Sequence, residues 1–125
     1  MPKKVAPPPP RPPESMLPLA PATFDILLAL ADGEKHGYGI MKEVAARTNG
    51  AVQIGAGTLY GALKRLLASG VVEEIERDDP DDASGRRRYY RLTRHGLDVA
   101  RAESWRLAKV VQDAHQKKLI PRRAG

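Results

Sequence analysis

The residues best suited to chemistry lie in one predicted helix, from about Ala56 to Ser69. At roughly 100° per residue, the leucines of this segment share one face of the helix. Small residues let a helix backbone approach a partner closely, and a lysine flanked by hydroxyl groups suits a phosphate-lined groove. The pattern therefore indicates contact with nucleic acid, although an ordinary solvated helix face can have a similar composition. The residues on and beside the face opposite the leucines are Gly57, Thr58, Tyr60, Gly61, Lys64, Arg65 and Ala68.

A second basic group is the run of four arginines between residues 86 and 91, which contains no acidic residue. Three of them are candidates for contacts with phosphates, namely Arg86, Arg87 and Arg88. Residues 73 to 82, in contrast, hold seven acidic residues and a single arginine. Pairing of the arginines across a hairpin with Glu73, Glu74 and Glu76 is an alternative explanation that requires no partner.

Catalysis, metal binding and cofactor binding find no support in the sequence. The three histidines, His36, His95 and His115, fall on separate predicted elements and lack the spacing of helical metal ligands. The chain has no cysteine, which excludes disulfides and thiolate ligands. No glycine-rich phosphate loop follows a predicted strand. We therefore expect no catalytic residue, no metal site and no cofactor.

Composition limits the class of protein further. The 125 residues are 42% hydrophobic and 29% charged, which is ordinary for one soluble domain. The net charge of +6 is concentrated at the two ends of the chain, so it is weak support for a polyanionic partner by itself. No apolar run has the length of a membrane span or the form of a signal peptide. We expect a cytoplasmic protein that does not bind membranes.

The order of the predicted elements favours one DNA-binding fold. Helices are expected over residues 21–31, from Gly39 to Asn49, and over 56–69, followed by strands over 71–77 and 86–93. Three short helices followed by a hairpin are typical of the winged helix-turn-helix, in which the third helix enters the DNA major groove. The predicted fold class is therefore mainly α with a small β-hairpin. This order favours DNA contact for the outer face of the third helix.

The last predicted helix, over residues 94–119, is too long for a small domain to cover. At 1.5 Å per residue it would extend ~39 Å, and its apolar positions wrap widely around it. A homodimer that pairs this helix symmetrically would cover the apolar residues. The predicted organisation is a disordered proline-rich leader (1–18), a winged-helix domain (19–93), a dimerisation helix (94–119) and a tail (120–125). The candidate interface residues are Leu97, Trp105, Ala108 and Val111.

Four segments together resemble the PadR family of bacterial transcriptional regulators. They occur in the order found in the family, and with the last helix they cover residues 19–119. The resemblance implies a winged-helix dimer that usually represses genes, binds a palindromic operator and releases it when a signal such as a small molecule arrives. The single C-terminal helix resembles the compact branch of the family. The four segments are Leu27–Gly33, His36–Ile40, Gly57–Leu66 and Arg88–Thr93.

The resemblance also implies roles for single residues. Thr58, Tyr60, Lys64 and Arg65 would lie on the recognition helix, and Tyr38 would approach DNA or pack beside it. Trp105 and its symmetry mate could flank a cavity for a flat aromatic effector, whereas simple packing of the indole is the alternative. For the whole protein, the alternative is a winged-helix module that binds proteins through its arginine strand and proline-rich segment.

Overall fold

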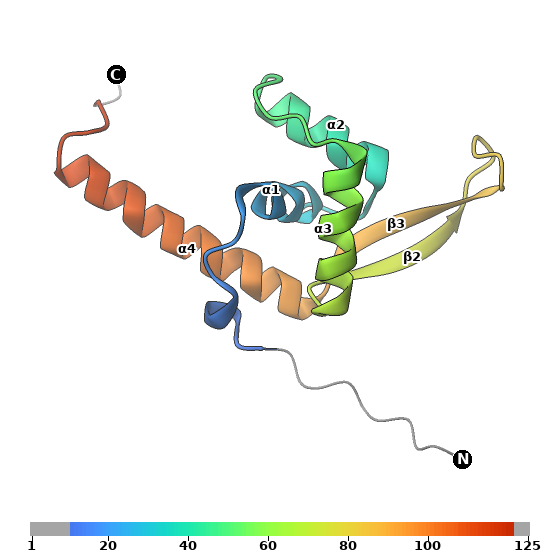
Figure 1. Ribbon diagram of the computed structural model, residues 1–125, viewed down its shortest axis with the longest axis horizontal. Coiled ribbons are helices and arrows are strands. Elements are labelled where there is room, and N and C mark those ends of the chain that lie inside the picture. The colour runs from blue at the N-terminus through green and yellow to red at the C-terminus, as the bar shows by residue number, and fades with distance from the viewer. Residues whose placement is uncertain (1–10, 122–125) are drawn as a thin grey trace, which may run out of the picture.

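The computed structural model describes residues 11–121 (Figure 1). Within them lie four α-helices, three strands and a short 3-10 turn. Helices α1 to α3 gather at the centre, the β2–β3 hairpin projects to one side, and α4 projects to the other (Figure 1). In chain order the elements are η1 (Pro13–Met16), α1 (Pro21–Leu30), β1 (Lys35–His36), α2 (Gly37–Arg47), α3 (Ala56–Ala68), β2 (Val72–Asp78), β3 (Arg86–Leu92) and α4 (Arg94–Gln116).

The core lies where α1, α2 and α3 meet. Helix α1 is buried on more than one side, since Ile26, Leu27 and Leu30 are all at most 2% exposed. On α3, Leu59 and Leu63 are fully or almost fully buried. The prediction that the leucine face of α3 points inward is confirmed, and the winged-helix fold class is confirmed with it.

The sheet has one strand more than the predicted two-stranded ribbon. It is antiparallel, with the order β1-β3-β2. Strand β1 pairs Lys35 with Tyr90 and His36 with Tyr89. A strand of two residues is too short to show an alternating pattern, so the sequence carried no sign of it. Its addition ties the start of α2 to the hairpin.

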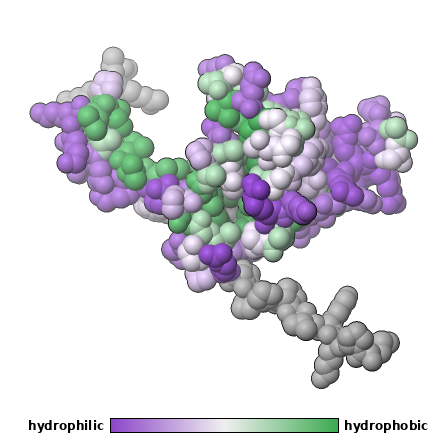
Figure 2. Space-filling model, in the orientation of Figure 1, coloured by the Kyte–Doolittle hydropathy of each residue, from purple (hydrophilic) through white to green (hydrophobic). Residues whose placement is uncertain are grey.

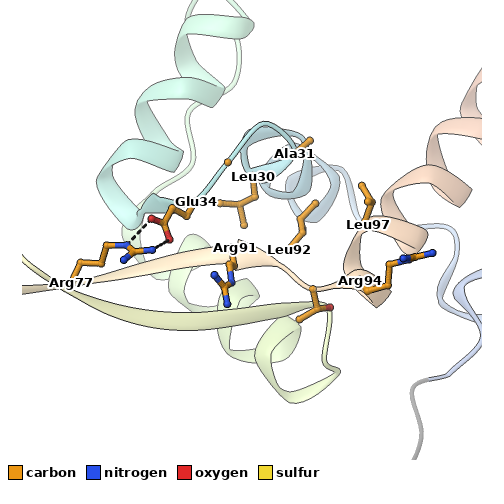
Figure 3. A pocket seen from close by; sticks show the side chains of 10 residues that line it. Leu30, Ala31, Glu34, Arg77, Arg91, Leu92, Arg94 and Leu97 are labelled. Carbon is orange, nitrogen blue, oxygen red and sulfur yellow. Dashed lines mark hydrogen bonds and ion pairs between the residues drawn. The ribbon is translucent and has the colours of Figure 1, made fainter.

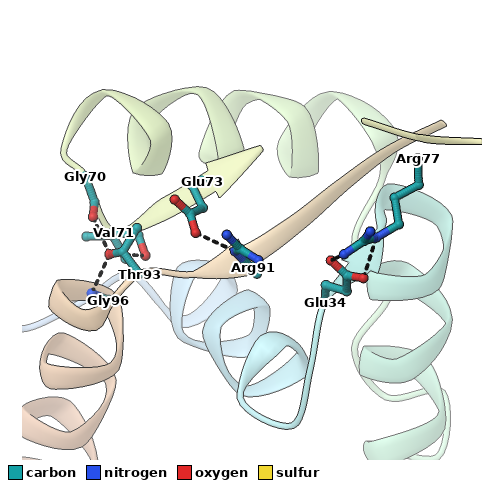
Figure 4. Close-up of polar contacts among 8 residues, drawn as sticks. All are labelled: Glu34, Gly70, Val71, Glu73, Arg77, Arg91, Thr93 and Gly96. Atoms are coloured by element: carbon teal, nitrogen blue, oxygen red, sulfur yellow. Dashed lines mark hydrogen bonds and ion pairs between the residues drawn. The ribbon is translucent and has the colours of Figure 1, made fainter. Parts of the chain in front are cut away.

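Helix α4 begins at a tightly built joint with the α3–β2 turn (Figure 4). Thr93 is the N-cap of α4, and its side chain accepts a hydrogen bond from the Gly96 amide at 2.9 Å. The Thr93 hydroxyl also donates to the carbonyl of Gly70, and the Thr93 amide donates to the carbonyl of Val71 at 3.1 Å. A Cβ atom added at Gly96 would overlap the carbonyl oxygen of Val71. Only glycine therefore allows this approach of α4 to the turn.

Part of the segment expected to be disordered is ordered, because residues 13–16 form η1, which packs against α4. The amide of Leu19 donates to Oε2 of Glu103 at 2.8 Å, and Glu103 is only 1% exposed. The guanidinium of Arg106 and this amide hold the pKa of Glu103 below its ordinary value. These contacts order a stretch that proline content alone marks as extended. Residues 1–10 of the predicted leader lie outside the described residues.

The far end of α4 also differs from the prediction. The helix ends at Gln116 rather than Leu119, and Lys118 adopts a left-handed backbone with a φ of 61°. Several large apolar side chains on this half are exposed, including Val110 and Val111. No helix within residues 11–121 is both long and apolar enough to cross a membrane.

Candidate nucleic-acid interface

The outer face of α3 is open and basic. The side chains of Thr58, Tyr60, Lys64 and Arg65 are exposed, and Gly61 is half-buried among them. Helix α3 begins after Gly55 and contains no acidic residue. None of the ion pairs formed among residues 11–121 includes Lys64 or Arg65. The face therefore presents two cations that no carboxylate of the described chain neutralises.

The start of α2 lies beside this face. Tyr38, in the first turn of α2, is 61% exposed, and the Lys42 ammonium lies 5.6 Å from the centre of its ring. The Tyr60 phenol contacts the backbone of Gly37 so closely that a Cβ at Gly37 would overlap its hydroxyl. Tyr38 and Tyr60 thus meet at one hollow of about 440 Å³. Its lining is His36, Gly37, Tyr38, Tyr60, Asp82, Arg87, Arg88 and Tyr90.

The arginines of β3 are paired with carboxylates. Arg88 lies 3.2 Å from Glu74, and Arg86 lies 3.1 Å from Glu76. Arg91 pairs with Glu73, on the opposite face of the sheet (Figure 4). The structure thus confirms the alternative explanation of the arginine run, in which the arginines pair with glutamates across the hairpin.

Arg87 has a partner that sequence reasoning missed. Its guanidinium lies 2.9 Å from the carboxylate of Asp79, in the turn between the strands. The sequence identified this turn by its aspartates, but which of them reaches back to β3 depends on the hairpin geometry. Arg87 and Arg88 nonetheless line the hollow beside Tyr60.

A second hollow, of about 460 Å³, lies between the end of α1, the base of the hairpin and the start of α4 (Figure 3). The Arg77 guanidinium donates two hydrogen bonds to the Glu34 carboxylate, at 2.6 and 2.9 Å, and holds the pKa of Glu34 below its ordinary value. Of its lining residues, only Leu97 was a sequence candidate. The lining comes from three separate stretches of the chain, residues 30–34, 77 and 91–97, so no local pattern could have predicted it.

A third hollow is an apolar groove of about 410 Å³ between α1 and α4. Leu97, Trp105 and Ala108 line it together with Leu27 and Leu28 of α1. Trp105 is 78% exposed. Val111, the fourth sequence candidate, lies farther along α4 and is not part of the lining. In Figure 2 the projecting part of α4 has hydrophobic residues along one side and hydrophilic residues along the other.

The described part of the chain contains no group of three or more histidine or acidic side chains that could hold a metal ion.

Comparisons with known proteins agree with this geometry. The family model described as "Transcriptional regulator PadR-like family" matches residues 26–102. A transcriptional regulator from Clostridium thermocellum is 31% identical with a TM-score of 0.60, and the match covers 73% of this chain and 88% of that one. An uncharacterized protein from Lysinibacillus sphaericus is 38% identical over 57% of this chain, which spans 63% of that relative.

A further structural match is Bacillus subtilis PadR, determined in complex with operator DNA. The sequence identity is 18% and the TM-score 0.55, over 86% of this chain and 52% of that one. At this identity the match shows a shared fold.

Proposed function

Because the chain belongs to the PadR-like family of transcriptional regulators, we propose that it binds specific sequences of double-stranded DNA through the outer face of α3. The observation that carries the proposal is the exposed pair Lys64 and Arg65, for which no ion pair is present within residues 11–121. Contacts of lysine and arginine with phosphates and base edges supply both affinity and sequence discrimination in the major groove.

In the proposed docking, α3 lies in the major groove with Lys64 and Arg65 toward the DNA. Thr58 and the Tyr60 hydroxyl donate hydrogen bonds to phosphates, and Tyr38 reaches the backbone from the start of α2. Gly61 lets the helix backbone come close. Three arginines of β3 add phosphate contacts at the edge of the DNA-binding surface, namely Arg86, Arg87 and Arg88. Each must break its ion pair with a carboxylate before it can contact a phosphate.

The active form is proposed to be a homodimer that binds a palindromic operator. The support is the apolar groove between α1 and α4 together with the exposed Trp105, Val110 and Val111. Two recognition helices related by a two-fold axis would read half-sites about one DNA turn apart. Because Val111 is exposed beyond the groove, Val111→Glu should shift the protein toward monomer in size-exclusion chromatography with light scattering. An unchanged mass would contradict the role of this face.

We further propose that the protein acts in the cytoplasm as a repressor. A small, flat aromatic compound would bind the protein and relieve the repression. Trp105 of each subunit would flank the bound compound, and a changed separation of the long helices would no longer match the half-site spacing. Titration with planar cationic compounds should quench the tryptophan fluorescence. Trp105 is the single tryptophan of the chain, so quenching reports on this position directly. Absence of quenching would remove the main support for the effector.

Selection of duplexes from a random library tests the central proposal. We expect enrichment of a palindromic sequence and binding that weakens steeply with salt, because each phosphate contact releases counterions. A promoter that contains the selected sequence should then be repressed in a reporter assay. A protein-interaction module, the alternative function, would enrich no sequence.

A further inference from the structure

His36 occupies the junction between three parts of the proposed DNA-binding surface. It is the last residue of β1 and the N-cap of α2. Its Nδ1 accepts a hydrogen bond from the amide of Gly39 at 2.9 Å. Its ring meets the edge of Tyr89 in β3 at 5.4 Å between centroids and stacks on Tyr38 at 6.5 Å. One imidazole therefore contacts both α2 and the hairpin.

The cap requires the neutral form of this imidazole. A ring nitrogen that accepts a hydrogen bond carries no proton, so the proton of neutral His36 lies on Nε2. A second proton would occupy Nδ1 and break the bond to Gly39. It would also put a positive charge at the N-terminus of α2, where the helix dipole is already positive.

The surroundings of His36 disfavour the charged form. Burial lowers the pKa of His36 below its ordinary value of 6.5, and the Arg87 guanidinium lowers it further, whereas the Asp79 carboxylate acts in the opposite direction. The titratable and charged side chains around the ring come from every neighbouring element. They are Tyr38, Lys42 and Glu43 of α2, Tyr60 of α3, Arg87, Arg88, Tyr89 and Tyr90 of β3, and Asp79 and Asp82 of the hairpin turn.

The first turn of α2 in turn supports the α3 face. Gly37, directly after His36, is the residue whose backbone the Tyr60 phenol contacts. Tyr38, the next residue, carries the exposed ring at the rim of the same hollow. If the turn frays when the cap is lost, both tyrosines lose their fixed positions. A side chain without a fixed position loses conformational entropy when it becomes ordered on binding, and this cost lowers the affinity for DNA.

We propose that His36 is a positioning residue that holds Tyr38 and Tyr60 in the geometry for DNA binding only while its imidazole is neutral, so that acidification releases the DNA. The inference rests on the proposed function and adds a means of regulation to the same site. Because neutral His36 is favoured in the folded protein, the cap is complete above the ordinary histidine pKa and is lost as the pH falls through the folded value.

The test compares wild type with His36→Asn across pH 7.5 to 5.0, on the duplex selected by wild type. Asparagine is a good N-cap that does not titrate in this range. Wild-type affinity should fall about fivefold, the effect of losing one cap, whereas the His36→Asn variant should change less than about twofold. His36→Ala, which has no cap at any pH, should bind weakly throughout. His115→Gln is the matched control, because it removes an exposed histidine at the far end of α4 and should follow wild type.

A second readout needs no DNA. In nuclear magnetic resonance spectra of the full chain, the amide of Gly39 should shift with the same midpoint as the His36 ring. Three results would each overturn the inference while leaving the proposed function intact. They are coincident pH profiles of DNA affinity for wild type and His36→Asn, a wild-type affinity that rises as the pH falls, and a Gly39 amide shift that does not change as the His36 ring titrates. Absence of any DNA binding at pH 7.5 would overturn the proposed function, and the pH control of binding with it.

Discussion

Two basic regions of the molecule, the outer face of α3 and the strand β3, differ in what their charges already contact. Strand β3 has twice as many cations as the α3 face, four arginines against Lys64 and Arg65. Each of the four arginines has a carboxylate within ion-pair distance. No such pair within residues 11–121 includes the two cations of α3. The number of basic residues is thus a poor guide to the charge that a region offers to a partner.

The difference has a simple physical origin. Antiparallel pairing sets the acidic strand β2 beside β3, so that Glu73 lies directly opposite Arg91. On the other face of the sheet, Glu74 and Glu76 reach diagonally to Arg88 and Arg86. Helix α3 contains no acidic residue that could pair within the helix. A phosphate must compete with a carboxylate for the arginines, but not for Lys64 and Arg65. We therefore expect the α3 face to dominate affinity.

The largest effect is expected for the double variant Lys64→Ala/Arg65→Ala. Affinity for the selected duplex should fall about 10- to 100-fold, and the slope of log affinity against log salt should decrease by about two, one for each lost phosphate contact. Fluorescence anisotropy at several salt concentrations measures both quantities. Lys109→Ala is the matched control, since Lys109 is exposed on α4 and paired with Asp113 at 2.6 Å. Affinity equal to wild type would refute the proposed docking.

A smaller effect, of opposite sign, is expected when an arginine of β3 loses its partner. Glu74→Gln frees Arg88 beside the hollow at Tyr60, so DNA affinity should rise a few-fold and the salt slope should increase by about one. Glu73→Gln frees Arg91 on the other face of the sheet and serves as control, with no change expected. If Arg88→Ala weakens binding as much as Lys64→Ala does, the contrast between the regions is wrong.

The smallest effect concerns the helix that carries the face. Gly61→Ala should stabilise the protein by up to ~1 kcal/mol, because alanine has the higher helix propensity. An added Cβ would meet only the tip of Arg65, at 3.7 Å. Thermal unfolding should show a rise of a few degrees. Gly70→Ala makes the same exchange where φ is +74° and should lower the melting temperature instead. A lower melting temperature for Gly61→Ala would mean that the face is more crowded than the structure indicates.

Periodic features of the molecule were predictable, and contacts between distant segments were not. The leucine spacing of α3 identified its buried face, because burial of one helix face imposes a period of about 3.6 residues. Glu103, by contrast, has the pattern of a solvated residue on α4, and its burial depends on Leu19, 84 positions earlier in the chain. Of the candidate DNA-binding residues, those of α3 could be named from the pattern of that helix alone. Whether the arginines of β3 form ion pairs with β2 depends on the register of the hairpin. The amino-acid composition does not determine that register.

The joint at Gly96 gives α4 the mechanics of a lever. Its first turn abuts the α3–β2 turn with no space for even a methyl group, so this end acts as a fulcrum. Over the 23 residues of α4, at 1.5 Å each, a tilt of about 5° displaces the tip by about 3 Å. We therefore expect a displacement of the tip of α4 to be transmitted to the end of α3. A larger residue at position 96 would separate the start of α4 from the α3–β2 turn and so remove the coupling between them.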